Sequence, residues 1–592
     1  MKKTFFYIAF LFSLSVFAQN EQLALNYFER GEFEKALASY EALSKLQPGN
    51  FVFFQKQTEC LQQLSQFDKA EKNLAERYKI YKQPALLVEI GYNYQLQKKE
   101  DKAKDYYEQA IAKINENPDN VYQVAINFEK KIVLNYALKA YETALKKEPK
   151  YNFNYQMAML HGQLGNTDLM IEKFLNESQS NPETLVMIQN QLSRYMTDEG
   201  SEKFNQSLRK ALLIRAQKEQ DILWAHYLSW FFVQQKEYAK AFIQEKAIFK
   251  RNPESLYNIV NLGQLAKEEK ETETAREIFT FVLNNTQDKE MQLQIHTALM
   301  TLKIESAPEK EYPLLTGELE KLVADFGVNP YSVNLQILQA HFLTFNLKQP
   351  EKAIAILKQT QQLPLIIYQQ AKVTMELADI FLFHEKYNQA LLYYSQIEES
   401  LKNNEIGHEA SLKAAKTSYF KGDFDWALQQ FKVLKSASSQ LIANDALEYF
   451  LLINDNTVAD STRTALKKLS RGDYLLYQNK FTEALAQFSA IVKEHKGEEI
   501  ESVTLYKLGN TYEKLGDFTS ALSQYQKIID HHNESIYIDE ALYFSAEIYN
   551  KQLKDTDKAK ALYEKILFKH EDSIYFIDSR KKFRELRGDT NL

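Results

Sequence analysis

Residues 508–529 read LGNTYEKLGDFTSALSQYQKII, and a stretch of the same kind recurs along the chain of 592 residues. The copies align on an alanine equivalent to Ala521, and neighbouring copies are mostly 33 to 38 residues apart. The aligned residues are Ala36, Ala70, Ala103, Ala137, Ala241, Ala275, Ala353, Ala390, Ala427, Ala484, Ala521 and Ala559. Self-similarity at this period predicts stacked supersecondary units.

A second small residue mostly lies twelve positions before the alanine. Two antiparallel helices approach closely only where neither carries a bulky side chain, so this pair predicts a helix–helix contact. Aromatic residues such as Tyr512 and Tyr525 would fill the space around it. The small residues are Ala24, Gly91, Ala125, Ala158, Gly263, Ala378, Ala415, Gly472, Gly509 and Ala546; turn glycines are Gly31, Gly165, Gly422 and Gly516; prolines at helix ends are Pro48, Pro149, Pro182 and Pro253.

This order of small, aromatic, turn and proline positions resembles the tetratricopeptide repeat. The resemblance implies an all-α superhelical solenoid of antiparallel helix pairs, with roughly 13 to 15 units in two or more arrays. Met170 replaces the alanine in 151–183, and the stretches 184–222 and 288–330 keep a helical pattern without the signature. These three stretches are interpreted as degenerate units.

The C-terminal copies have a longer period and contain ESIYIDEALYF (534–544) and DSIYFIDSRKKF (572–583). They resemble the repeats of outer-membrane assembly lipoproteins and Tol-associated coordinators, although both stretches lack the proline usual in those families. Ser535 and Ser573 are predicted to cap helix N-termini through their hydroxyls. The stretch 407–431 resembles exported tetratricopeptide proteins of Gram-negative envelopes.

The distance from Ala427 to Ala484 is about one unit plus twenty residues. The excess contains an apolar helix over 441–455 without a partner of repeat type, followed by the polar stretch 456–462. This predicts a junction between arrays. The expected division is a signal peptide at 1–18, an N-terminal array at 19–287, a middle array at 288–437 and a C-terminal array at 438–592.

The composition excludes several classes of protein. Sixteen glycines and 11 prolines are few for this length, which favours helices joined by short loops. The net charge of −6 shows no basic excess of the kind that a nucleic-acid binder carries. The single cysteine, Cys60, allows no internal disulfide or cysteine zinc cluster, and we interpret it as a small buried side chain.

Residues 1–18, MKKTFFYIAFLFSLSVFA, combine two lysines, a short apolar run and a small-residue end. This predicts a secretory signal cleaved before Gln19, with an uncleaved membrane anchor as the alternative. We therefore expect an exported protein, periplasmic or associated with the outer membrane of a Gram-negative envelope. No later segment is apolar enough to predict a transmembrane span.

No catalytic motif is present, and we predict no enzyme activity, cofactor or metal. The run HEKYN (384–388) lacks the second histidine of a zinc motif, and DHHNE (530–534) lies between repeats with too few convergent ligands. Both are interpreted as exposed loops. The basic run 580–587 is interpreted as a solvated terminal helix, with a membrane surface or an acidic partner as the alternative.

In proteins of the family resembled, the first helix of each pair lines the concave face. Carried onto this chain, the resemblance implies these candidate partner-binding residues: Tyr92, Gln95, His226, Trp230, Gln264, Tyr506, Asn510, Glu513, Tyr543 and Glu547. The alternative for each is packing against the next repeat. The basic set that clamps a C-terminal carboxylate in some relatives is missing from these positions.

These observations predict a non-enzymatic, exported protein-interaction scaffold or adaptor that binds proteins or extended peptides. We expect it to serve an envelope assembly or secretion complex, through peripheral association with the outer membrane. The alternative is a peptide- or glycan-binding solenoid, or the helical body of an envelope enzyme. No gap in the repeats is long enough for a separate catalytic module.

Overall fold

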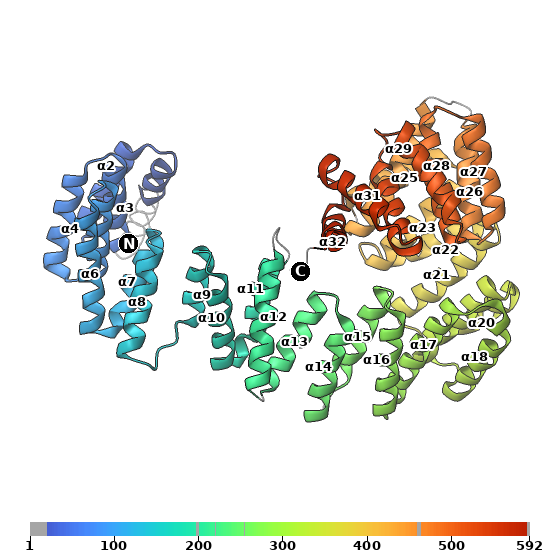
Figure 1. The fold of residues 1–592 in the computed structure, drawn as a ribbon, viewed down its shortest axis with the longest axis horizontal. Helices are drawn as coiled ribbons and strands as arrows, with labels where there is room; N and C mark the ends of the chain where they lie inside the picture. The colour runs from blue at the N-terminus through green and yellow to red at the C-terminus, as the bar shows by residue number, and fades with distance from the viewer. Residues whose placement is uncertain are drawn as a thin grey trace, which may run out of the picture. The chain divides into compact units, whose positions relative to one another are not determined.

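A computed structural model describes residues 20–196, 201–219, 221–253, 255–437, 439–458 and 463–588. These residues form helices joined by short turns, and the described ranges contain no strand. The predicted signal peptide and its cleavage point before Gln19 lie outside them. The chain, whose helices Figure 1 draws from blue at the N-terminus to red at the C-terminus, packs as two compact units, one ending at Ile248 and the other beginning at Phe249.

The first unit is a succession of antiparallel helix pairs that begins with a helix over residues 20–29. Short 3-10 turns lie at η1 (Pro118–Asn120) and η2 (Pro182–Thr184). The other helices are α2 (Phe33–Leu46), α3 (Phe51–Gln63), α4 (Phe67–Tyr81), α5 (Ala85–Leu96), α6 (Glu100–Glu116), α7 (Val121–Lys130), α8 (Leu134–Lys147), α9 (Asn154–Gln163), α10 (Thr167–Ser180), α11 (Leu185–Met196), α12 (Ser201–Lys218), α13 (Ile222–Gln234) and α14 (Tyr238–Arg251), which reaches into the second unit.

The second unit continues the pairs and adds η3 (Glu309–Glu311), η4 (Pro330–Ser332) and the π-helical turns η5 (Phe342–Asn346) and η6 (Ile548–Gln552). Its helices are α15 (Tyr257–Glu268), α16 (Thr272–Asn285), α17 (Lys289–Ser306), α18 (Tyr312–Phe326), α19 (Val333–His341), α20 (Pro350–Thr360), α21 (Ile367–Phe383), α22 (Tyr387–Ser400), α23 (Glu405–Lys421), α24 (Phe424–Ala437), α25 (Gln440–Val458), α26 (Thr464–Tyr477), α27 (Phe481–Glu494), α28 (Glu499–Lys514), α29 (Phe518–His531), α30 (Ile538–Glu547), α31 (Thr556–Lys569) and α32 (Phe576–Arg587).

The predicted small-residue contact joins the two helices of a pair. Ala521 is fully buried, and a Cβ atom added to Gly509 would lie 2.3 Å from the Tyr525 ring. A Cβ atom at Gly472 would meet Phe488 at the same distance. Real Cβ contacts are never this short, so these positions accept only the smallest side chain. The prediction of an all-α solenoid of antiparallel helix pairs is confirmed.

The turn between paired helices contains a residue with a left-handed backbone conformation. Gly31, Gly165, Gly422 and Gly516 all have positive φ, as their spacing predicts. The sequence pattern missed that other residues adopt the same conformation in the remaining turns. One of them is Ile132, with φ 57°, a conformation that is unfavourable for a β-branched side chain. The cooperative packing of the two helices therefore sets this turn, whichever residue occupies it.

Helix α25 is the extra helix predicted between Ala427 and Ala484. It packs against α24 through Ile442, Ala446 and Ile453, and the next helix, α26, pairs with α27. Helix α25 therefore has no second helix of its own. One cluster of buried side chains includes residues from Leu412 to Tyr537, on both sides of the predicted array boundary between 437 and 438. The division of the chain into arrays stays a prediction.

Two local predictions are refined. The hydroxyl oxygens of Ser535 and Ser573 accept the backbone N–H groups of Tyr537 and Tyr575 at 3.3 and 3.2 Å. Helices α30 and α32 begin one residue after each tyrosine, so the serines cap the preceding turn rather than the helix. Cys60 is fully buried as predicted, and burial raises the pKa of its thiol to about 12, which keeps the thiol protonated.

Candidate functional site

Polar residues on successive first helices contact one another at a fixed spacing in the second unit. A residue directly after the small residue of one first helix meets the residue 34 or 35 positions later, on the next first helix. We call these two positions a rung. Ion pairs occupy three rungs: Asp379 with Lys413 at 2.7 Å, Asp473 with Lys507 at 2.9 Å, and Glu547 with Lys582 at 2.6 Å.

These ion pairs are shielded from solvent. The side chains of Lys507 and Asp473 are 17% and 6% exposed. Burial opposes the charge on Lys507, but the negative charges of Asp473 and Glu448 outweigh burial and raise the lysine's pKa. The Tyr419 hydroxyl also donates to Asp473 at 2.9 Å. An ion pair at a rung fills the space between two first helices and leaves no room for a ligand. We call such a rung closed, and a rung without a charged pair open.

A tyrosine on the second helix closes the same positions from the other side. The Tyr525 hydroxyl donates to the Asn510 side-chain oxygen at 2.5 Å, and the Tyr394 hydroxyl donates to Asp379 at the same distance and sequence spacing. Tyr563 donates to Glu547 in the same way. The aromatic residue that packs against the small residue thus also satisfies the polar group next to it.

The rung that precedes these has the opposite arrangement of charge. His341 follows Ala340 and lies 3.0 Å from the Glu376 carboxylate, 35 residues later. Burial lowers the pKa of His341, but the hydrogen bond to Glu376 and the charges of Glu376 and Asp379 outweigh it, so the net shift is upward.

Two rungs on α15, α17 and α19 carry no charge. Gln264 and Ala298 occupy one. Thr301 and Leu335 occupy the other, in which Met300 stands at the position of the small residue; both pairs have the spacing of 34 residues. Ala298 stands where the closed rungs have lysine. Phe279 stands where the rungs of Asp379 and Glu547 have tyrosine, and one of its ring atoms would lie 2.5 Å from a Cβ built at Gly263. Because Phe279 has no hydroxyl, the hydrogen bond from Tyr525 to Asn510 has no counterpart at Gln264.

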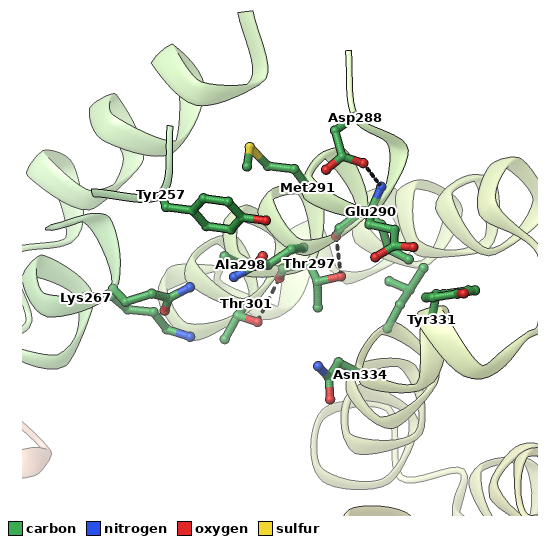
Figure 2. A pocket seen from close by; sticks show the side chains of 14 residues that line it. Tyr257, Lys267, Asp288, Glu290, Met291, Thr297, Ala298, Thr301, Tyr331 and Asn334 are labelled. Atoms are coloured by element: carbon green, nitrogen blue, oxygen red, sulfur yellow. Dashed lines mark hydrogen bonds between the residues drawn. The ribbon is translucent and has the colours of Figure 1, made fainter. Parts of the chain in front are cut away.

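A pocket of about 420 Å³ lies at these open rungs (Figure 2). Tyr257 from α15 and Tyr331 from η4 stand on opposite sides of it in Figure 2 and are 65% and 69% exposed. The remaining lining residues are Gln264, Lys267, Asp288, Glu290, Met291, Leu293, Gln294, Thr297, Ala298, Thr301, Asn334 and Leu335. Most of this lining is uncharged, with amides and hydroxyls around an apolar floor.

The two threonine hydroxyls that line the pocket donate their hydrogen bonds within α17. The hydroxyls of Thr297 and Thr301 donate to the backbone carbonyls of Leu293 and Thr297 at 2.8 and 2.9 Å (Figure 2). Asp288 caps α17 by accepting the Glu290 N–H at 3.0 Å. With their protons used within the helix, the threonine oxygens can accept a hydrogen bond from a ligand.

Of the predicted partner-binding residues, only Gln264 lines this pocket. Tyr92 and Gln95 lie on α5, where Lys131 stands 5.1 Å from the Tyr92 ring centre and the Tyr107 hydroxyl donates to Gln95 at 2.7 Å. His226 and Trp230 lie one turn apart on α13, both half-buried, and Trp230 meets Tyr227 edge-on. These four residues belong to the first unit.

The C-terminal predicted residues lie on α28 and α30 and contact neighbouring repeats. Tyr506 stacks on Tyr537 with ring centres 4.9 Å apart, and Tyr543 stacks on Tyr575 at 4.3 Å. Burial raises the pKa of Glu513, which accepts the Tyr525 hydroxyl at 3.2 Å. Because Asn510 and Glu547 also accept tyrosine hydroxyls, the polar groups of these residues are already satisfied within the stack.

Sequence reasoning missed most residues of the pocket, including Tyr257, Thr297, Tyr331 and Asn334. The helices α17 and α19 fall in or after a stretch interpreted as degenerate, which hid their register. A signal was nevertheless present: Ala298 stands where three other rungs have lysine, and Phe279 stands where the rungs of Asp379 and Glu547 have tyrosine.

The two histidine runs show no metal geometry. His384 is half-buried at a helix–helix turn, and burial lowers its pKa. His531 ends α29, and His532 lies 3.4 Å from Glu501. Throughout the residues that the structure describes, no three histidine, cysteine, aspartate or glutamate side chains gather in a way that could hold a metal ion. Nor does any described helix have the length and apolarity required to cross a membrane.

Comparison with known proteins identifies the repeat. Models described as tetratricopeptide repeat match residues 84–112, 504–535 and 540–573. The chain carries tetratricopeptide repeats. The matched segments correspond to α5 with most of α6, α28 with α29, and α30 with α31.

Similarity to individual proteins is low. Two solved structures align at 12% identity with a TM-score of 0.26 each: "Structure of Naa15/Naa10 bound to HypK-THB" and "Crystal structure of APC/C hetero-tetramer Cut9-Hcn1". The first alignment covers 96% of this chain and 92% of that one, and the second covers 98% of both. No curated protein matches the chain. Alignments at this TM-score carry no argument about function.

Proposed function

We propose that this protein is a non-enzymatic interaction scaffold, and that the pocket on α15, α17 and α19 holds an extended segment of a partner protein. The open rungs carry this proposal. Two exposed tyrosines, Tyr257 and Tyr331, flank them, and the floor is apolar. Exposed aromatic residues around adaptable polar groups are typical of protein recognition.

The chemistry of the lining favours an uncharged stretch of main chain. Gln264, Gln294 and Asn334 each offer an amide that both donates and accepts, as an extended backbone does. Ala298 leaves the space that a lysine fills in the closed rungs, so a partner's side chain can enter there.

A photo-crosslinking experiment tests the site. A benzophenone amino acid is placed at Tyr257 or Tyr331, and at Tyr81, which is exposed on the second helix α4, as the control. We expect crosslinked partner polypeptides from the two pocket positions and not from Tyr81. A second variant, Thr297→Arg, fills the pocket and should abolish crosslinking while the helical circular dichroism spectrum stays unchanged.

The outcome also separates two classes of ligand. Crosslinked material removed by protease supports a protein partner, whereas material removed only by glycosidases would identify the pocket as a glycan site. Equal yields at Tyr257, Tyr331 and Tyr81 would contradict the proposed site.

We further propose that the protein is exported and serves an envelope complex. The apolar run in residues 1–18 and the resemblance of residues 534–544 and 572–583 to exported repeats support this. Fractionation of cells, with N-terminal sequencing of the recovered chain, tests it. A chain that begins at Gln19 in the envelope fraction is expected, and a chain that retains Met1 in the cytoplasm would contradict export.

A further inference from the structure

Three of the 14 side chains that line the pocket of α15, α17 and α19 are charged, and they lie at its two ends. Lys267 is on one side of the pocket in Figure 2, and Asp288 and Glu290 are on the other side. The lining between them, which includes Thr297 and Ala298, is uncharged. The pocket therefore has a basic end and an acidic end, separated by hydrogen-bonding and apolar groups.

The charges at the two ends have no partner within the protein. Lys267 is half-buried and Glu290 is exposed, and neither forms an ion pair with any residue that the structure describes. Asp288 is already engaged, because its carboxylate accepts the Glu290 N–H at 3.0 Å. The lysines of the closed rungs differ, since each of them has an acidic partner, as Lys507 has in Asp473. Lys267 and Glu290 are therefore available to a charged ligand.

Helix dipoles account for the sign of each charge but do not neutralise it. Glu290 lies in the first turn of α17 and Lys267 in the last turn of α15. The partial charges of helix ends favour acidic side chains in a first turn and basic side chains in a last turn. The carboxylate and the ammonium group can each still form a charge-assisted hydrogen bond with a ligand, which is stronger than a bond between neutral groups.

The separation of the two ends sets the spacing that a ligand needs. Lys267 precedes Thr301 by 34 residues, which is the spacing of the rungs, so Lys267 lies level with Thr301 on the neighbouring helix. Glu290 precedes Thr301 by eleven residues on α17, which corresponds to about 16 Å along the helix axis. Because an extended chain advances about 3.3 Å per residue, about five residues span the pocket from one charge to the other.

We propose that the partner segment carries an acidic and a basic side chain about five residues apart, the acidic one paired with Lys267 and the basic one with Glu290. This inference rests on the binding function proposed above and names the chemistry of the segment that the pocket selects. The main chain between the two charged side chains passes Thr297 and Thr301, whose hydroxyl oxygens accept its N–H groups.

A library of random dodecapeptides, displayed on phage and selected on the full chain, tests the spacing. Peptides that bind the wild-type chain but not Thr297→Arg, in which the pocket is filled, are the pocket ligands. We expect them to be enriched in an acidic and a basic residue about four to six positions apart. Pocket ligands without such a pair would overturn the inference and leave the proposed binding function intact. If Thr297→Arg excluded no selected peptide, the binding function itself would be contradicted as well.

Two single substitutions test the charges with one selected peptide. Lys267→Glu makes both ends of the pocket acidic, and Glu290→Lys makes both basic, so a segment with one charge of each sign is repelled at one end in either direction. We expect the peptide to bind each variant about tenfold more weakly than wild type in fluorescence anisotropy. Replacing the acidic residue of the peptide with lysine should make it prefer Lys267→Glu to wild type, and replacing its basic residue with glutamate should make it prefer Glu290→Lys.

The control variants change the same charges one residue away. Glu268→Lys and Lys289→Glu reverse exposed charges next to the two pocket residues, on side chains outside the lining. They should alter the affinity for the peptide by less than about twofold, because solvent screens exposed charges. Equal losses in the pocket and control variants would show that only the net charge of the protein matters, and pocket variants with unchanged preferences would place the charged groups of the peptide elsewhere. Either result would overturn the proposal.

Discussion

The pocket at α15–α19 and the C-terminal stack from α26 to α32 have the same repeat geometry but different residues at the rungs. In the C-terminal stack, Lys507 and Lys582 reach acidic residues on the preceding first helix and fill the space between helices. At the pocket, Ala298 leaves that space open beside Gln264. The residue 34 or 35 positions after the first member of a rung therefore decides whether the space between first helices is filled or left open.

The largest effect is expected from breaking a closed rung. Lys507→Ala removes the partner of Asp473, whose side chain is 6% exposed, and should destabilise the protein by about 3 kcal/mol, because an unpaired buried carboxylate remains. Urea unfolding measures the loss. The control Lys514→Ala, at an exposed lysine on the same helix, should change stability by less than about 0.5 kcal/mol. Equal losses in the two variants would mean that the rung contributes nothing specific.

The next effect concerns the contact that both regions share. Ala521→Leu in the C-terminal stack and Ala275→Leu beside the pocket both overfill a fully buried site. Each should cost about 2 kcal/mol in thermal or urea unfolding, because the facing ring cannot move without displacing its helix. If Ala275→Leu were tolerated and Ala521→Leu were not, the two regions would differ in backbone packing as well as at the rungs.

A third change places an ion pair at the open rung of the pocket, as in the closed rungs of the C-terminal stack. Gln264→Glu together with Ala298→Lys installs an ion pair at the rung of the pocket. Crosslinking from Tyr257 should fall about tenfold, while stability changes by less than about 1 kcal/mol, because the new pair stays partly exposed. The control Ala298→Ser keeps the pocket open and should retain crosslinking. Undiminished crosslinking in the double variant would place the ligand elsewhere.

The smallest effect is a pH dependence at the rung that follows the pocket. The folded-state pKa of His341 is raised above its unfolded value of about 6.5, so its stabilising pairing with Glu376 is fully present below that value. The stabilisation is lost as the pH rises through the higher, folded-state pKa. Because 48% of the imidazole side chain is exposed, it amounts to less than about 1 kcal/mol.

His341→Gln isolates this contribution. The difference in melting temperature between wild type and variant should be larger at pH 5.5 than at pH 8.5. Other histidines, including His384 with its lowered pKa, are present in both proteins and cancel in the difference. A difference that does not change with pH would show that His341 is not charged in the folded protein at pH 5.5.

Local pattern was sufficient to predict the fold. The small residues at Gly509 and Ala521 require a helix pair because only small side chains permit that contact, and the period then repeats it along the chain. The extra helix at α25 was also visible as an interruption of the period. The pocket was not visible, because its lining comes from three helices and depends on a register of α17 that the degenerate unit concealed.

The sequence by itself therefore determined the repeated helix pair, its turn and its packing residues, since these are short-range consequences of side-chain size and spacing. Only the tertiary structure decided which first-helix residues are available to a partner. Asn510 and Glu547 look like surface residues in the sequence, but tyrosine hydroxyls from the second helix occupy them. Gln264 differs because the residue 34 positions later is Ala298, which cannot fill the space that Lys507 fills beside Asp473, and only contact in space gives that substitution its meaning.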